Sequence, residues 1–174
     1  DKIELLSVDK FCKTIKKIQL AIFLENRQYL GEKWKEVISN LLFQEDYVLA
    51  QSLLKDVYNL METDFSVSEL FDIFLMSSYC CLKLCDFHSD LLQTWFRELH
   101  NLSLIAEISP EQMKWYYLLQ AKYYLAVGQY QALIRQTAEL RTIEHQLRHN
   151  RAIGNKHQYG LSCGILSLKR GIKR

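Results

Sequence analysis

The chain has 174 residues, of which 49% are hydrophobic, and it carries a formal net charge of +2. This length suits one domain with a sizeable core. One proline and six glycines are too few for the many turns of a β-sandwich or β-barrel, so the composition favours helices over these classes.

The cysteines predict a reducing environment. There are five, at positions 12, 80, 81, 85 and 163, and two of them are adjacent within an apolar segment. An odd count without a dense framework indicates free thiols, so we expect a cytoplasmic or nuclear protein. The longest uncharged apolar stretch, residues 73–82, is far shorter than the roughly 20 residues that span a bilayer, so we expect no membrane partner.

Charge is distributed unevenly along the chain. From Arg148 onward there are seven basic residues and no acidic one, and four of the six glycines also fall in this stretch. The preceding part carries 15 basic and 20 acidic residues, a balance of −5. We therefore expect a helical domain over residues 1–150, followed by a basic, glycine-containing tail over residues 151–174.

Apolar residues recur at steps of three and four throughout residues 1–150, which predicts seven helices and no persistent strand. The first helix is expected to end near Gly31. Ser66 with Glu69 forms a capping-box pattern at the start of another. Ser109 followed by Pro110 marks the clearest helix start, because serine caps free amides and proline fits the first helical position.

Three of the predicted turns between helices share one form. They are residues 45–47, 85–87 and 128–130, and each places an aromatic residue just after the turn. Such an aromatic can pack between the two helices that the turn connects. This repetition predicts an array of similar helical hairpins.

These residues resemble the tetratricopeptide repeat family, whose consensus places aromatic, small and glycine residues at set offsets. The matching residues are Trp34, Tyr47, Ala50 and Leu54 in the first hairpin, Phe74, Ser78 and Phe87 in the second, and Ala121, Tyr124, Gly128 and Tyr130 in the third. Departures are Ile38, Glu45 and Leu133, which stand where the family has smaller residues. The turn aromatics are also spaced more widely than the family's period of 34 residues.

The resemblance implies an all-α fold: a right-handed array of about three helical hairpins after an N-terminal helix. An unrelated helical bundle remains an alternative, because any antiparallel helical hairpin requires apolar faces of this period. Trp34 and Ala50 are expected in the core of the first hairpin.

In the family, the first helix of each hairpin lines a groove that holds a peptide or a helix. The groove positions predict these partner-binding residues: Lys35, Ser39, Phe43, Tyr79, Lys83, Trp115 and Lys122. One lysine in each hairpin suits an acidic peptide or a free carboxylate. The aromatic residues suit instead an apolar partner helix, with Trp115 open to the groove.

Sequence patterns of catalysis are absent or out of context. Residues 160–164 spell Gly-Leu-Ser-Cys-Gly, but no acidic residue or histidine follows to complete a hydrolase triad. Cys81, Cys85 and His88 share a helical face, yet no fourth zinc ligand is evident. We therefore expect no catalytic residue, no metal and no cofactor.

The function predicted from the sequence is a non-enzymatic protein–protein interaction module, a scaffold or adaptor. Two alternatives remain. The domain is the peptide-sensing part of a larger transcription regulator, or it is an accessory nucleic-acid-binding protein. The second alternative rests on the basic tail and on Lys10, Lys13 and Lys17, which share one side of the first helix. Oligomeric state is not predicted.

Overall fold

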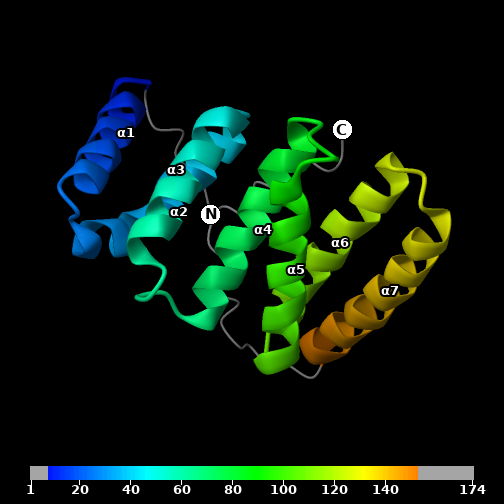
Figure 1. The fold of residues 1–174 in the computed structure, drawn as a ribbon. Helices are drawn as coiled ribbons and strands as arrows, with labels where there is room; N and C mark the ends of the chain where they lie inside the picture. The colour runs from blue at the N-terminus through cyan, green and yellow to red at the C-terminus, as the bar shows by residue number, and fades with distance from the viewer. Residues whose placement is uncertain (1–7, 153–174) are drawn as a thin grey trace. The chain divides into compact units, whose positions relative to one another are not determined.

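The computed structural model describes residues 8–152, and within this range the chain forms seven α-helices and no strand (Figure 1). The helices are α1 (Val8–Phe23), α2 (Arg27–Phe43), α3 (Tyr47–Met61), α4 (Val67–Lys83), α5 (Asp90–Ile105), α6 (Pro110–Ala126) and α7 (Tyr130–Ala152). The predicted all-α class with seven helices is confirmed. Most of the predicted basic tail, residues 153–174, lies outside the described residues, as does the Gly-Leu-Ser-Cys-Gly segment.

The first helix is shorter than predicted. It ends at Phe23, and α2 begins at Arg27, so Gly31 lies inside α2 instead of ending α1. The turn is closed by Glu25 in a left-handed conformation, φ 51°. The amide of Asn26 donates to the carbonyl of Ala21 at 2.8 Å, which satisfies a carbonyl at the helix end.

The same turn geometry occurs at four places within residues 8–152. The left-handed residues are Glu25, Glu45, Cys85 and Gly128, and in each turn the next amide donates five residues back, at 2.8–3.0 Å. Three of these turns were predicted from the sequence, and the one at Glu25 was missed. At the turn of Cys85 the next helix begins later than at the others: α5 begins at Asp90, after the N-cap Ser89, so Phe87 precedes the helix.

Both predicted helix starts are confirmed. The amide of Glu69 donates to the hydroxyl of Ser66, and the carboxylate of Glu69 accepts from the Ser66 amide at 2.9 Å, which completes a capping box. Ser109 caps α6 through the amide of Gln112, and Pro110 occupies the first turn. These caps fix where α4 and α6 begin.

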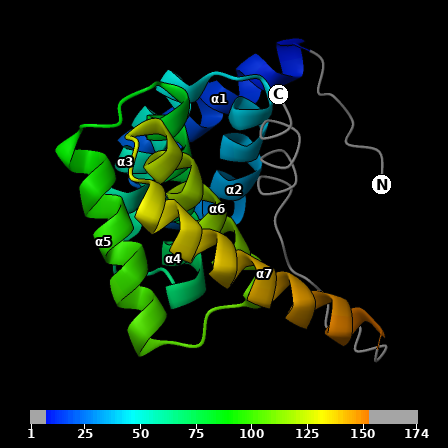
Figure 2. The same cartoon turned by 90° about the vertical axis from the view of Figure 1, so that its right-hand side faces the viewer.

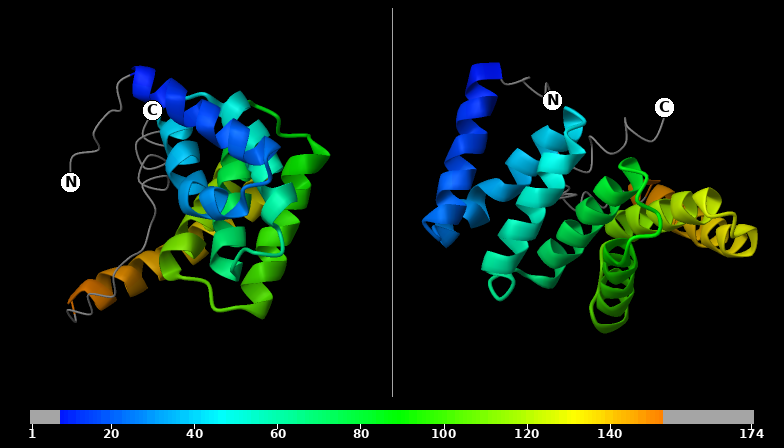
Figure 3. Two further views of the ribbon diagram at one scale, coloured as in Figure 1. Left: turned by 90° about the vertical axis from the view of Figure 1, so that its left-hand side faces the viewer. Right: turned by 45° about the horizontal axis from the view of Figure 1, so that its top comes forward.

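The helices form two compact units, α1–α3 and α4–α7. In the first unit α2 packs against both α1 and α3, and the three follow one another as neighbours (Figure 3). Trp34 and Ala50 are fully buried, as predicted. An exposed ion pair between Arg27 and Asp64, at 3.0 Å, connects the start of α2 to the residues just after α3.

In the second unit α4 packs against α5 and α6, and α6 packs against α7. The last turns of α7 extend past the N-terminal end of α6, where that helix begins (Figure 2). Every residue from 71 to 82 is buried, so α4 forms the centre of this unit. Phe74 stacks on Trp95 of α5, with ring centroids 5.1 Å apart. Phe71 meets Tyr116 of α6 edge to face, at 6.1 Å.

A buried amide also connects α4 to α6. The side-chain nitrogen of Gln112 donates to the carboxylate of Asp72 at 2.9 Å and to the carbonyl of Ser68 at 3.0 Å. Both Gln112 and Asp72 are 4% exposed. Because a buried carboxylate requires hydrogen-bond donors, this contact fixes the register of the two helices at their N-terminal ends. Among residues 8–152, no helix has the length and hydrophobicity needed to cross a bilayer.

Candidate interaction site

Two of the three aromatic residues predicted to line a groove are buried. Tyr79 is 1% exposed and Trp115 is 3% exposed. The expectation that Trp115 is open to a groove is therefore wrong. The reason is that α6 has helices on two sides: Tyr116 contacts α4, and Lys114 pairs with Glu144 of α7 at 3.2 Å. The indole of Trp115 belongs to the packed part of α6.

In the first unit, the predicted residues on α2 differ in exposure. Ser39 is buried, and its hydroxyl donates to the carbonyl of Lys35 within the same helix. Lys35 and Phe43 are half-buried, and the Lys35 ammonium lies 5.4 Å from the ring of Trp34. Lys35 and Phe43 are thus the accessible members of this set. The other four predicted residues belong to the second unit.

Of the two predicted residues on α4, Tyr79 and Lys83, only Lys83 is accessible, and the rest of this side of the helix is buried. Asp72, Leu75, Tyr79 and Leu82 are each at most 4% exposed, whereas Lys83 is half-buried. The ammonium of Lys83 lies 5.6 Å from the ring of Tyr79, a cation–π contact that holds the charge at the end of the helix. The accessible part of α4 is therefore its C-terminal turn.

Lys122 on α6 lies close to this turn. Burial lowers the pKa of its ammonium, and the positive charge of Lys83 lowers it further, while the thiol of Cys85 acts in the opposite direction. No carboxylate among the described residues contributes to this shift. Lys83 and Lys122, which we call the lysine pair, thus bring two like charges together on neighbouring helices.

The outer side of α6 adds apolar surface next to the lysine pair. Leu118, Lys122 and Leu125 follow one another at steps of four and three, so they share one side of the helix. Leu118 is half-buried and Leu125 is 59% exposed. Both leucines also fall on groove positions of the tetratricopeptide pattern, although only Trp115 and Lys122 of α6 were chosen as binding residues.

The lysine pair can bind an anion. Two partly desolvated ammonium groups repel each other, and the repulsion is stronger at lower dielectric than in bulk water. A carboxylate placed between them replaces this repulsion with two attractive contacts. The leucines beside the pair supply apolar contact area for the residues that flank such a carboxylate.

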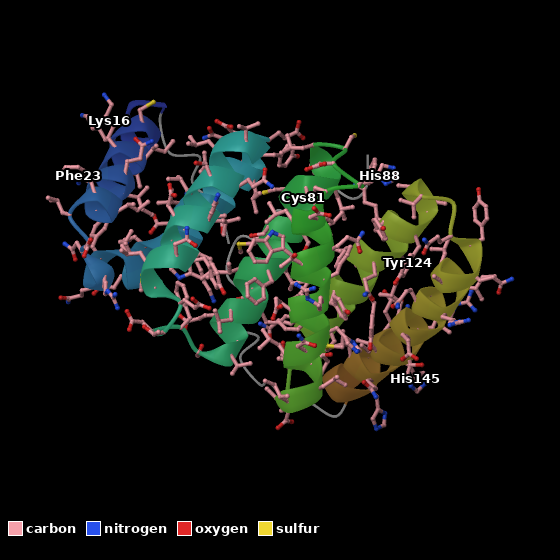
Figure 4. All side chains as sticks on the ribbon, viewed as in Figure 1. Lys16, Phe23, Cys81, His88, Tyr124 and His145 are labelled. Carbon is pink, nitrogen blue, oxygen red and sulfur yellow. The ribbon has the colours of Figure 1, made fainter. Side chains whose placement is uncertain are left out.

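The cysteine-rich segment has no features of a catalytic or metal centre. Cys81 is buried, whereas Cys85 and His88 are exposed near the end of α4 (Figure 4). No group of three potential ligands gathers for a metal anywhere in residues 8–152. Burial raises the pKa of the Cys80 thiol, so it stays protonated at neutral pH and behaves as a small apolar residue.

Three tyrosines of α6 lie in partly desolvated positions. Burial raises the pKa of Tyr116, Tyr117 and Tyr124, and neighbouring tyrosines add to the effect for Tyr116 and Tyr124. The amide of Gln120 donates to the Tyr116 hydroxyl at 2.8 Å. These neutral phenols form the polar part of the α6 packing, and they carry no charge that competes with the lysine pair.

Comparison with protein-family models, curated proteins and solved structures finds no match to this chain.

Proposed function

We propose that this protein is a non-enzymatic interaction module, a scaffold or adaptor, that binds an acidic segment of a partner protein at the lysine pair. The resemblance to tetratricopeptide repeats supports this proposal, because Lys83 and Lys122 both fall on positions that face the peptide groove in that family. The proposal concerns the second helical unit alone.

The observation that supports the proposal most strongly is the position of Lys83 and Lys122 on the packed helices α4 and α6, where the charge of Lys83 acts on Lys122. The lowered pKa of Lys122 means that its ammonium is less stable than that of a lysine in water, because it is partly buried and lies near Lys83. A bound carboxylate removes this penalty, so part of the binding free energy is already present in the free protein as unfavourable electrostatic energy. A lysine that serves only solubility is fully hydrated and lacks this property.

The exposure of the neighbouring residues favours an acidic ligand over a purely apolar one. An apolar partner helix requires large anchors, and two of the predicted anchors, Tyr79 and Trp115, are buried. What remains accessible is the lysine pair with Leu118 and Leu125. The ligand that fits best is a peptide in which acidic residues lie near leucine-like side chains.

A direct test uses a synthetic peptide of alternating glutamate and leucine, with a second peptide in which glutamine replaces each glutamate. Binding is measured by calorimetry at low salt. We expect Lys122→Gln to weaken binding of the acidic peptide by about ten-fold, since charged contacts in a partly desolvated site are worth about 1.5–3 kcal/mol. Lys55→Gln is the matched control, because Lys55 is an exposed lysine of α3.

The same experiment reports on the site directly. Isotope-labelled methyl groups on the lysines allow the pKa of Lys122 to be followed by NMR, and it should rise when the acidic peptide binds. The glutamine peptide should leave it unchanged. Equal losses for Lys122→Gln and Lys55→Gln would show only nonspecific charge attraction and would contradict the proposal, as would an unchanged pKa of Lys122.

A further inference from the structure

Helix α1 has a side that is exposed to solvent and that neither α2 nor α3 covers. Six residues, which we call the α1 stripe, follow one another at helical spacing along this side and into the turn just after the helix: Lys13, Lys16, Lys17, Leu20, Phe23 and Leu24. At about 100° per residue they lie within one third of the helix circumference. The packed side of α1 is formed by other residues, among which Ile18 and Ala21 are buried.

The apolar end of the stripe is unusually exposed. Leu20 is 55% exposed, Phe23 is 82% exposed and Leu24 is 62% exposed. Phe23 is the last residue of α1, immediately before the turn at Glu25, so it projects at the corner between two helices. Figure 4 shows that Lys16 and Phe23 lie on the same outer side of α1. Three adjacent exposed apolar side chains indicate a contact surface more strongly than scattered ones do.

The other end of the stripe is positively charged. Lys13, Lys16 and Lys17 are all exposed, and residues 12–24 contain no acidic residue. Among residues 12–149, whose side chains the structure describes, these lysines make no ion pair. The acidic residues nearest in sequence are Asp9, one turn before Lys13, and Glu25, just after the tip. The three lysines thus give the stripe an excess of positive charge next to an apolar tip.

We propose that the α1 stripe docks on an anionic membrane surface, with Leu20, Phe23 and Leu24 inserted at the interface and the lysines at the phosphate level. Lys13 and Leu24 are separated by about 16 Å along the helix axis, from a rise of about 1.5 Å per residue. A helix lying flat can therefore bring both ends to the headgroup region together. This site is on the first unit and does not depend on the lysine pair.

The shape of the tip decides between a membrane and a protein partner. Phe23 projects from a corner, so a protein must offer a preformed pocket to bury it. A fluid interface closes around a projecting aromatic without such a pocket, and anionic lipids supply the complementary charge. The sequence-based expectation of no membrane partner rested on the length needed to span a bilayer. Docking on the surface requires no such length.

The experiment uses the full chain and two kinds of vesicle. One contains phosphatidylcholine alone, and the other contains phosphatidylcholine and phosphatidylserine at a ratio of about 7:3. Binding is measured by co-sedimentation at low and at physiological salt. We expect at least about ten-fold tighter binding to the anionic vesicles, because three lysines near the surface contribute additively.

Two double variants distinguish insertion of the apolar tip of α1 from nonspecific hydrophobic adsorption to the vesicles. Phe23→Ser with Leu24→Ser should reduce binding to anionic vesicles by about ten-fold or more, since two large apolar contacts are removed. Leu104→Ser with Ile105→Ser is the matched control, because these α5 residues are 71% and 77% exposed. It should change binding by less than about two-fold. Circular dichroism checks that each variant remains helical.

A third variant tests the charged end. Lys16→Gln with Lys17→Gln should weaken binding and reduce its dependence on salt. Absence of binding to anionic vesicles would overturn the proposal, and so would equal losses in the α1 and α5 apolar variants. If only the lysine variant loses binding, and a 20-base-pair RNA duplex binds with the same lysine dependence, the stripe is a polyanion site and membrane docking is refuted.

Discussion

Gly31 on α2 faces Met61 on α3, and a β-carbon added at Gly31 would lie 3.4 Å from the terminal methyl of Met61. This distance is an ordinary van der Waals contact. Gly31 lies inside a helix, where glycine is conformationally unfavourable in comparison with alanine. The sequence pattern assigned this glycine to a helix end, and the structure shows that its backbone needs no special freedom.

Gly31→Ala should therefore stabilise the protein. The expected gain in the free energy of unfolding is about 0.5–1 kcal/mol, because alanine restricts the unfolded chain and favours the helix. Urea denaturation followed by circular dichroism measures it. A loss of stability would show that Met61 cannot adjust to the added methyl group and that the α2–α3 contact is tighter than the structure indicates.

Gly128→Ala should have the opposite effect. Gly128 has φ 73° and nothing within 4 Å of an added β-carbon, so the cost is purely conformational, about 1 kcal/mol. The reverse substitution is available at the equivalent turn: Glu45 has φ 64°, and Glu45→Gly should be neutral or stabilising by up to about 1 kcal/mol. Thermal unfolding of both variants provides the comparison, and destabilisation by Glu45→Gly would contradict it.

Trp115→Ala should damage the fold. Removal of a buried large aromatic is expected to cost about 3–5 kcal/mol, comparable to Trp34→Ala. Tyr130→Ala is the control, because Tyr130 is 64% exposed and should change stability by less than about 0.5 kcal/mol. Denaturant unfolding distinguishes the two. If Trp115→Ala retained full stability, its indole would not be part of the core.

Gln112 should be important for the contact between α4 and α6. Gln112→Ala removes a donor from the buried carboxylate of Asp72 and should cost about 2 kcal/mol. Gln112→Glu should cost more than Gln112→Ala, because it removes the same donor and also places a second carboxylate against that of Asp72. Denaturant unfolding measures both variants, and equal costs would exclude this repulsion.

The tyrosines of α6 predict loss of stability in alkaline solution. Because burial raises the pKa of Tyr116, Tyr117 and Tyr124, the folded state keeps protons that the unfolded state loses. Their contribution is complete below about pH 10, the ordinary tyrosine pKa, and is lost as the pH rises above it. Lys122, whose pKa is lowered, acts in the opposite direction but is a single group. Absorbance at the phenolate band follows the ionisation of the tyrosines, and the free energy of unfolding is measured at about pH 9 and 11. Ionisation of all ten tyrosines together in a single step would contradict the prediction.

The elements were predictable because their signals are local. Helical periodicity, the capping box at Ser66 and the serine–proline start at Ser109 all depend on residues within one or two turns. The turn at Glu25 was missed because Arg27 stands where the other three turns have the aromatic residue that marked them in the sequence. Gly31, a stronger signal, drew the predicted helix end toward itself.

The site was less predictable because exposure depends on which helices pack together. The spacing of Trp115 from Lys122 is compatible with a shared outer side, yet Trp115 lies in the core and Lys122 at its edge. The predicted positions of Lys83 and Lys122 on neighbouring helices do come together, because α4 and α6 pack side by side. Their role in binding a partner remains a prediction.

The four left-handed turns also determine where the chain tolerates changes in length. Each turn is closed by hydrogen bonds within six residues, so one inserted residue would rotate the following helix by about 100° and expose its buried side. The connections over residues 62–66 and 106–109 are not closed in this way. Insertions, protease sites or a fused reporter domain are therefore best accommodated there and not at the four tight turns.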